Sequence, residues 1–310
     1  MEDFLLSVVV PMYYEEGVAE ECYKRLTKVM TENNYNYELI FINDGSKDKT
    51  LDILKDIASK DTKAKVISFS RNFGHQAAVS AGVQEASGDA VVIIDADLQD
   101  PPELIKDMIV LWKQGYEVVY AKRQKRKGET FFKLITAKYF YKFLGAMSDI
   151  DIPKDTGDFR LIDKSVAKVF NSMTEKNRFI RGMISWVGFN QIAIEYVRDE
   201  RFAGETKYPF KKMIKFAKDG IIAFSSKPLR IITSFGLMSV ILSFVVLVYS
   251  LLSKLLQKDI AKGWTSMMVA ITFFCGVQLL SLGIVGEYIA RIYDEIKGRP
   301  LYIVKDKINF

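Results

Sequence analysis

The chain has 310 residues, of which 49% are hydrophobic, and its 44 Lys and Arg against 38 Asp and Glu give a formal net charge of +6. This length fits one large domain or two modest ones. The two cysteines, Cys22 and Cys275, lie far apart and there is one histidine, which argues against a disulfide framework and against a zinc site of cysteine and histidine ligands.

Apolar runs alternate with amphipathic segments through the first 121 residues. In chain order, strands are predicted at 5–12, 37–42, 65–70, 90–94 and 116–121. Helices are predicted at 16–33, 48–59 and 74–86, and a fourth begins at 101–102, where two prolines suit a first helical turn. This alternation predicts an α/β fold with a mostly parallel, doubly wound sheet.

Two later segments combine basic and aromatic residues. Residues 121–145 contain eight Lys or Arg against one acid, Glu129, and residues 207–224 contain five lysines among several aromatic side chains. Such a composition is typical of amphipathic helices that lie in a membrane interface. An ordinary solvated helix packed on the core is the alternative interpretation.

Two stretches, 231–253 and 264–286, contain no charged residue over 23 residues each. A bilayer core of about 30 Å needs about 20 apolar residues in a helix. We therefore expect a transmembrane hairpin, with a pair of buried core helices as the alternative. Because the basic segments flank this anchor, the expected partner is a membrane and not nucleic acid. Lys and Arg gather outside the two outer ends, which predicts that both termini are cytoplasmic.

Polar residues follow the predicted strands at the point where each ends. The strand at 90–94 leads into Asp95, Asp97 and Gln99. In an open α/β sheet, ligands bind at the carboxyl ends of the strands. Oxygen ligands there suit Mg²⁺ or Mn²⁺, which can in turn hold a diphosphate. The sequence therefore predicts a metal and diphosphate site, as used in nucleotide chemistry.

The motifs at these strand ends resemble the family 2 glycosyltransferases. They are Pro11-Met-Tyr-Tyr-Glu-Glu, Asn43-Asp-Gly-Ser, Arg71-Asn-Phe-Gly-His, Asp95-Ala-Asp-Leu-Gln-Asp-Pro-Pro-Glu and Gly157-Asp-Phe-Arg-Leu. Within the family the chain is most similar to the polyprenyl-phosphate glycosyltransferases, which include dolichol-phosphate mannose synthase and the bacterial bactoprenol glucosyltransferases. The paired apolar stretches and residues 201–209 match the bacterial subgroup, and the resemblance covers nearly the whole chain.

This resemblance implies a GT-A-type (Rossmann-like) sheet and an inverting transfer of a sugar from a UDP-sugar to undecaprenyl phosphate. Glucose is the first choice of sugar, and N-acetylglucosamine, mannose or another nucleotide sugar are alternatives. A non-catalytic nucleotide-binding membrane adaptor is a remote alternative. The expected organisation is a cytoplasmic catalytic domain (1–206), interface helices (207–230), two transmembrane helices (231–290) and a cytoplasmic tail (291–310). The expected location is the bacterial inner membrane, with a separate flippase and a homo-oligomer as further partners.

The resemblance also implies residue roles on the donor side. The residues assigned to the nucleotide sugar are Pro11, Tyr13, Glu15, Asp44, His75 and Asp95. Mg²⁺ or Mn²⁺ would be held by Asp95, Asp97 and Gln99. A purely structural role for His75 remains open.

Asp158 is the implied catalytic carboxylate near the acceptor, beside the catalytic contribution of Asp97. General-base catalysis helps a nucleophile that must lose a proton, whereas a lipid phosphate is already ionised. Orienting groups or stabilising the transition state are therefore open roles for Asp158. An anionic acceptor needs cationic positioning. The candidate cations are Arg201 and Lys207 first, and then Arg123, Arg126 and Arg160.

Overall fold

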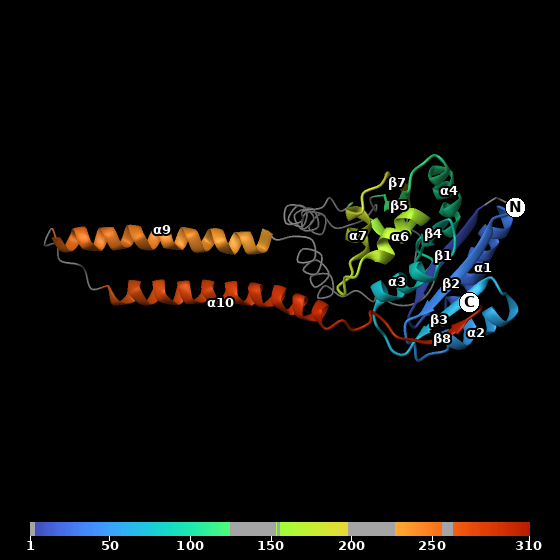
Figure 1. Ribbon diagram of the computed structural model, residues 1–310, viewed down its shortest axis with the longest axis horizontal. Helices are drawn as coiled ribbons and strands as arrows, with labels where there is room; N and C mark the ends of the chain where they lie inside the picture. The colour runs from blue at the N-terminus through green and yellow to red at the C-terminus, as the bar shows by residue number, and fades with distance from the viewer. Residues whose placement is uncertain (1–3, 125–152, 154–155, 198–226, 256–262) are drawn as a thin grey trace.

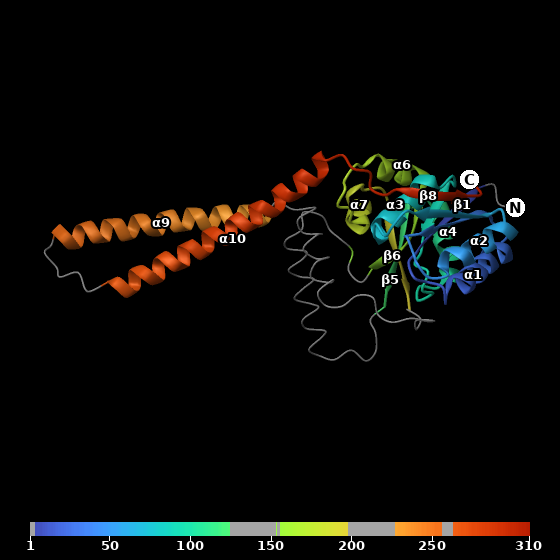
Figure 2. The same cartoon turned by 90° about the horizontal axis from the view of Figure 1, so that it is seen from below.

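The computed structural model describes residues 4–124, 153, 156–197, 227–255 and 263–310. They form a sheet with helices on both faces and a long pair of helices that extends away from it (Figures 1 and 2). The strands are β1 (Leu5–Met12), β2 (Asn36–Asn43), β3 (Ala64–Phe69), β4 (Ala90–Ile93), β5 (Val118–Arg123), β6 (Thr156–Asp163), β7 (Gln191–Tyr196) and β8 (Val304–Ile308). The helices are α1 (Ala19–Glu32), α2 (Thr50–Lys60), α3 (His75–Glu85), η1 (Pro102–Leu104), α4 (Ile105–Lys113), α6 (Lys164–Ser172), α7 (Ile180–Trp186), α9 (Lys227–Leu255) and α10 (Trp264–Ile296).

The elements predicted for the first 121 residues are confirmed, with ends that differ by no more than three residues. The sheet has the order β7-β5-β6-β4-β1-β2-β3-β8. Only β6 and β8 run against the other six strands, which confirms a mostly parallel sheet. As a result, the carboxyl ends of six strands and the beginning of β6 lie along one edge, which we call the strand-end edge.

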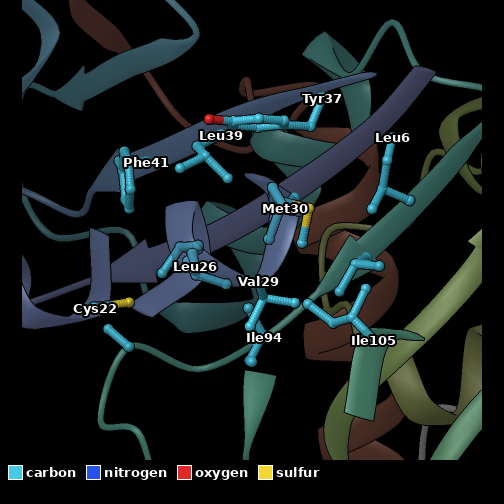
Figure 3. Packing of buried hydrophobic residues seen from close by; sticks show 14 of the residues in the cluster. Leu6, Cys22, Leu26, Val29, Met30, Tyr37, Leu39, Phe41, Ile94 and Ile105 are labelled. Atoms are coloured by element: carbon cyan, nitrogen blue, oxygen red, sulfur yellow. The ribbon is translucent and has the colours of Figure 1, made fainter. Parts of the chain in front are cut away.

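Alternate residues of the central strands enter two separate cores. In β2, Leu39 and Phe41 pack in a cluster with α1, α2 and α4, and Ile40 packs in a second cluster with α3, α6 and α7. Figure 3 shows Leu26 and Met30 of α1 among the residues of the first cluster. Burying such a side chain contributes about 1.5–3 kcal/mol. Burial on both faces explains why these strands are continuous apolar runs.

Helix α3 packs against the sheet at very short range. A Cβ atom at Gly82 would lie 2.2 Å from Val9 Cγ1 and 2.7 Å from Ile42 Cδ1, so only glycine fits there. This close contact with β1 and β2 fixes the distance between α3 and the sheet. The first residue of the helix, His75, is thereby held at the strand-end edge.

The last residues of the chain return to the sheet. Residues 304–308, which belong to the expected tail, form β8 beside β3. Just before β8, the Tyr302 ring stacks on Phe69 with centroids 4.9 Å apart, and its hydroxyl donates to Gln84 Oε1 at 2.7 Å. After it, Asn309 Nδ2 donates to the carbonyl of Ala58 at 2.7 Å. The helix pair is therefore followed by a segment anchored on the sheet.

Helices α9 and α10 contain the two stretches expected to span a membrane, and they lie side by side in both views (Figures 1 and 2). Length and composition identify one candidate span among the described residues, Phe273–Ile296, with a mean hydropathy of 1.6 and none of it buried. Leu279, Leu280 and Leu282 are 70%, 67% and 66% exposed. Because neighbouring helical positions differ by about 100°, these leucines cover several faces, and such a helix needs apolar surroundings.

Candidate active site

Side chains from β6, from the loop after β4 and from the start of α3 meet at the strand-end edge. Because β6 is antiparallel to β4, with Arg160 opposite Ile93, extending this register by two residues brings Asp158 level with Asp95. His75 lies next to both, with its Nε2 atom 3.0 Å from Asp158 Oδ2 and 3.7 Å from Asp95 Oδ1. The structure therefore brings together three residues that the sequence places 20 and 63 positions apart.

The loops that follow β1 and β2 are joined by hydrogen bonds. Tyr14 N donates to Ser46 Oγ at 3.1 Å, and Glu15 N donates to Thr50 Oγ1 at 2.9 Å. Pro11 is buried in β1, whereas the neighbouring Tyr13 is 39% exposed. The result is a fixed loop that presents an aromatic ring at the surface beside the edge.

Asp44 is buried and holds the loop between β3 and α3. Its Oδ1 accepts from Phe73 N at 2.7 Å, and its Oδ2 accepts from Gly74 N at 3.0 Å and from Asn72 Nδ2 at 2.9 Å. Burial raises the pKa of Asp44, although the backbone hydrogen bonds oppose the shift. Asp44 therefore positions the chain that leads into His75, in addition to any contact with a ligand.

Replacing Gly45 by alanine should lower the free energy of unfolding by about 3 kcal/mol, because left-handed backbone strain and overpacking act together. Gly45 has a φ of +69°, and a Cβ atom there would lie 2.3 Å from the carbonyl carbon of Arg71. Chemical denaturation of the purified protein measures the change. Gly17→Ala, where a Cβ atom would meet nothing within 4 Å, is the matched control. Equal stability of the two variants would contradict the packing argument.

Asp95 and Asp97 are half-buried at the edge, and Gln99 is 8% exposed. Gln99 N donates to Asp97 Oδ1 at 3.2 Å across Leu98, whose φ of +57° marks a tight turn. In the part of the chain that the structure describes, no group of three or more histidine, cysteine, aspartate or glutamate residues could hold a metal ion by itself. Two accessible carboxylates fit Mg²⁺ or Mn²⁺ when phosphate and water complete the coordination.

Asp158 is 4% exposed and lies among cationic side chains. His75 Nε2 faces its Oδ2 atom, and Arg181 Nε donates to its Oδ1 atom at 2.7 Å. Burial raises the pKa of Asp158, but Arg181 and His75 outweigh burial and hold this pKa well below its usual range. Asp158 is therefore a fixed carboxylate at neutral pH, with a cationic partner on each oxygen.

The pKa values of the neighbouring His75 and Asp95 are raised, whereas that of Asp158 is lowered. Burial lowers the pKa of His75, but the hydrogen bond to Asp158 and the charges of Asp95 and Asp158 raise it to about 9. Burial raises the pKa of Asp95; His75 opposes this shift, while Asp158 and other carboxylates add to it, giving a value of about 6. Burial and the neighbouring carboxylates thus oppose the ionisation of Asp95, and a bound cation would offset this effect.

The stability that His75 contributes should depend on pH. Its folded-state pKa of about 9 lies above the ordinary value of 6.5, so this contribution is complete below pH 6.5 and is lost as pH rises through 9. His75→Gln should therefore lower the melting temperature most at pH 6 and hardly at all at pH 10. Melting curves in EDTA, with the exposed Lys106→Gln as control, measure this trend. A pH-independent difference would show that His75 is not stabilised as the cation.

Arg160 is buried, and Arg123 is held by neighbouring side chains although its own side chain is 29% exposed. Arg123 Nε donates to the hydroxyl of Tyr196 at 3.1 Å, and its Nη2 lies 3.7 Å from Asp100, which also accepts a hydrogen bond from Tyr196. Arg160 is 4% exposed, and its Nη2 donates to the carbonyl of Gly157 at 2.9 Å. Both arginines thus brace the strand ends. The other expected acceptor cations, Arg126, Arg201 and Lys207, lie outside the described residues, as does most of the two basic segments.

Arg181, Asp100 and Tyr196 belong to the site although sequence reasoning did not select them. Arg181 lies 23 residues after its partner Asp158, and Tyr196 lies 96 residues after Asp100. Residues so far apart in the sequence form no local motif that would predict their contact. The one available signal was the length of the polar run after β4, which continues to Asp100.

Two family models match this chain. A family model described as "Glycosyl transferase family 2" matches residues 7–170, and one described as "GtrB C-terminal hairpin" matches residues 227–292. The second match and the exposed apolar span indicate membrane association.

Curated relatives match along nearly the whole chain. "Uncharacterized glycosyltransferase YkcC" of Bacillus subtilis (strain 168) is 56% identical over 96% of this chain and 93% of its own. "SfII prophage-derived bactoprenol glucosyl transferase" of Shigella flexneri is 41% identical over 97% of each chain. A solved structure of mannosyl-3-phosphoglycerate synthase from Rubrobacter xylanophilus superposes with a TM-score of 0.49 and 16% identity, over 70% of this chain and 71% of that one.

Proposed function

This chain belongs to the family 2 glycosyltransferases, and we propose that it transfers glucose from UDP-glucose to a polyprenyl phosphate with inversion at the anomeric carbon. The observation that carries this proposal is the meeting of Asp95 and Asp158 through His75 at the strand-end edge. It supplies a donor side with accessible carboxylates and an acceptor side with a fixed anion and cations. The name of the 41% identical relative supports the choice of glucose and of a bactoprenol-type acceptor.

On the donor side, Asp95, Asp97 and Gln99 would hold Mg²⁺ or Mn²⁺. The ion would supply Lewis-acid stabilisation of negative charge on the leaving diphosphate. Tyr13 and Glu15, on the loop after β1, would contact the nucleoside. Pro11 and Asp44 would support this surface from within, since both are buried.

The proposed reaction is a direct displacement. An oxygen of the lipid phosphate forms a bond to the anomeric carbon of glucose. The bond from that carbon to the β-phosphate oxygen of UDP breaks, and UDP leaves with the electron pair. A phosphate monoester is already ionised at neutral pH, so no proton has to be removed from the nucleophile. The enzyme's task is then to align two anionic groups on opposite sides of one carbon.

The membrane arrangement is part of the proposal. Residues 1–206 would form the catalytic domain, 207–230 interface helices, 231–290 two spans and 291–310 the returning tail, with the domain and both termini in the cytoplasm. The Lys and Arg excess outside the two outer ends supports this orientation. Two spans form no conduit for moving a glycolipid across the membrane, so we also propose a separate flippase. We propose in addition that the protein assembles as a homo-oligomer.

The test is sugar transfer by the full-length protein in detergent, with Mg²⁺ or Mn²⁺, undecaprenyl phosphate and a panel of radiolabelled nucleotide sugars. A labelled lipid from UDP-glucose alone is the expected result. A labelled lipid from UDP-N-acetylglucosamine or GDP-mannose instead would replace the sugar and keep the reaction. Protein that binds UDP but yields no labelled lipid from any donor would favour the non-catalytic nucleotide-binding adaptor.

A further inference from the structure

Three arginines near Asp158 differ in what they can offer to a ligand. Arg160 is 4% exposed and donates to backbone carbonyls. Arg123 has a side chain that is 29% exposed, but it is held by Tyr196 and Asp100. The side chain of Arg181 is 29% exposed while its Nε is bonded to Asp158 at 2.7 Å. It thus combines a fixed orientation with access to solvent at the strand-end edge.

The helix that carries Arg181 also lies on the side of the sheet domain toward the α9–α10 pair. It lies on α7, which is the helix of the sheet domain nearest to the α9–α10 pair in Figures 1 and 2. The loop before α7 is tied to the end of α10, since Lys176 N donates to Glu295 Oε1 at 2.7 Å. A phosphate on a membrane lipid would therefore approach the edge from the side on which Arg181 lies.

The Asp158 contact prepares Arg181 for such a phosphate. A guanidinium carries five N–H donors in a planar fork that matches phosphate oxygens. A bond from Nε to a buried carboxylate fixes the plane of the fork before the ligand arrives, which reduces the entropy lost on binding. Both Asp158 oxygens already have a nitrogen partner, His75 Nε2 at 3.0 Å and Arg181 Nε at 2.7 Å, so this carboxylate is poorly placed to take a proton from a substrate.

We propose that Arg181 binds the phosphate of the lipid acceptor and that Asp158 is its positioning residue. This inference rests on the proposed function, because it assigns the acceptor side of the same site. It gives Asp158 a role without proton transfer. It also predicts that the loss of Arg181 affects the acceptor and leaves the donor unaffected.

The test compares Arg181→Gln with wild type in full-length protein, measuring initial rates against undecaprenyl phosphate and against UDP-glucose separately. Losing charged hydrogen bonds to a phosphate should raise the acceptor KM by about 10- to 100-fold. The KM for UDP-glucose and the affinity for UDP should stay within about twofold of wild type. Arg181→Lys, which keeps the charge but not the fork, should give an intermediate acceptor KM. Lys168→Gln, on the exposed side of α6, is the control for the change in charge.

The outcomes separate this inference from the proposed function. If the wild-type protein transferred no sugar from any donor, the proposed function itself would be refuted. Normal transfer by wild type together with an unchanged acceptor KM in Arg181→Gln would overturn the role of Arg181 alone, even if kcat falls, since a merely structural residue would lower kcat without this selectivity. If Arg181→Gln fails to bind UDP, Arg181→Lys decides: a raised acceptor KM supports the proposal and an unchanged one refutes it.

Discussion

Asp97→Asn should reduce sugar transfer on the order of 10³-fold, because losing several kcal/mol of charge stabilisation in the transition state has that effect on rate. The substitution removes one of the two accessible carboxylates at the strand-end edge. It is nearly isosteric, and the asparagine oxygen can still accept the bond that Gln99 N donates to Asp97 Oδ1 at 3.2 Å. The turn through Leu98 and the fold should therefore be retained.

Rates with UDP-glucose and undecaprenyl phosphate over a range of Mn²⁺ concentrations measure this effect. The variant should need more Mn²⁺ for half-maximal rate, and EDTA should abolish transfer by wild type until metal is added back. Asp107→Asn, on the exposed side of α4, makes the same charge change outside the site and should retain wild-type rates. Full turnover of Asp97→Asn at wild-type Mn²⁺ levels would overturn the proposed metal ligands.

The parallel half of the fold was predictable because its strands are buried on both faces. In β1 every residue except Ser7 is apolar, and residues 39–42 of β2 form an unbroken apolar run, so the strands stand out from the helices between them. The same argument fails for β8 at the sheet edge, because three of its five residues, Lys305, Asp306 and Lys307, are charged. Its partner β3 lies more than 200 residues earlier, and no local pattern reports a pairing over that distance.

The site was predictable only in part, for a related reason. Strand-end motifs identify Asp95, Asp97 and His75, because parallel strands end at one edge. Asp158 reaches that edge for a different reason: β6 runs backwards, so its beginning meets the ends of the others. Arg181 comes from a helix whose packing is set by tertiary contacts. Its role therefore emerges only when side-chain distances are known.

Asp158→Asn should lower kcat/KM for the lipid acceptor by about 10²-fold, because Arg181 loses the carboxylate that fixes its orientation. It should also destabilise the protein by about 3 kcal/mol, since it leaves the buried Arg160 and the partly exposed Arg181 and His75 without their anion. The pKa of Asp158 is depressed, so its stabilising effect is present above the ordinary value and is lost only as pH falls through the lower folded-state value. The rate of wild type should therefore not decline between pH 7 and pH 5 through protonation of Asp158.

The two effects of Asp158→Asn can be separated with the double variant Asp158→Asn, Arg181→Gln. Removing the anion and one of its cations together should recover part of the lost stability, because the uncompensated charge of Arg181 disappears. Activity should stay low, since the double variant lacks both the positioning carboxylate and the phosphate-binding guanidinium. Melting temperatures and rates of the two single variants and the double variant complete the cycle. Recovery of activity together with stability would mean that this pair serves the fold and has no part in sugar transfer.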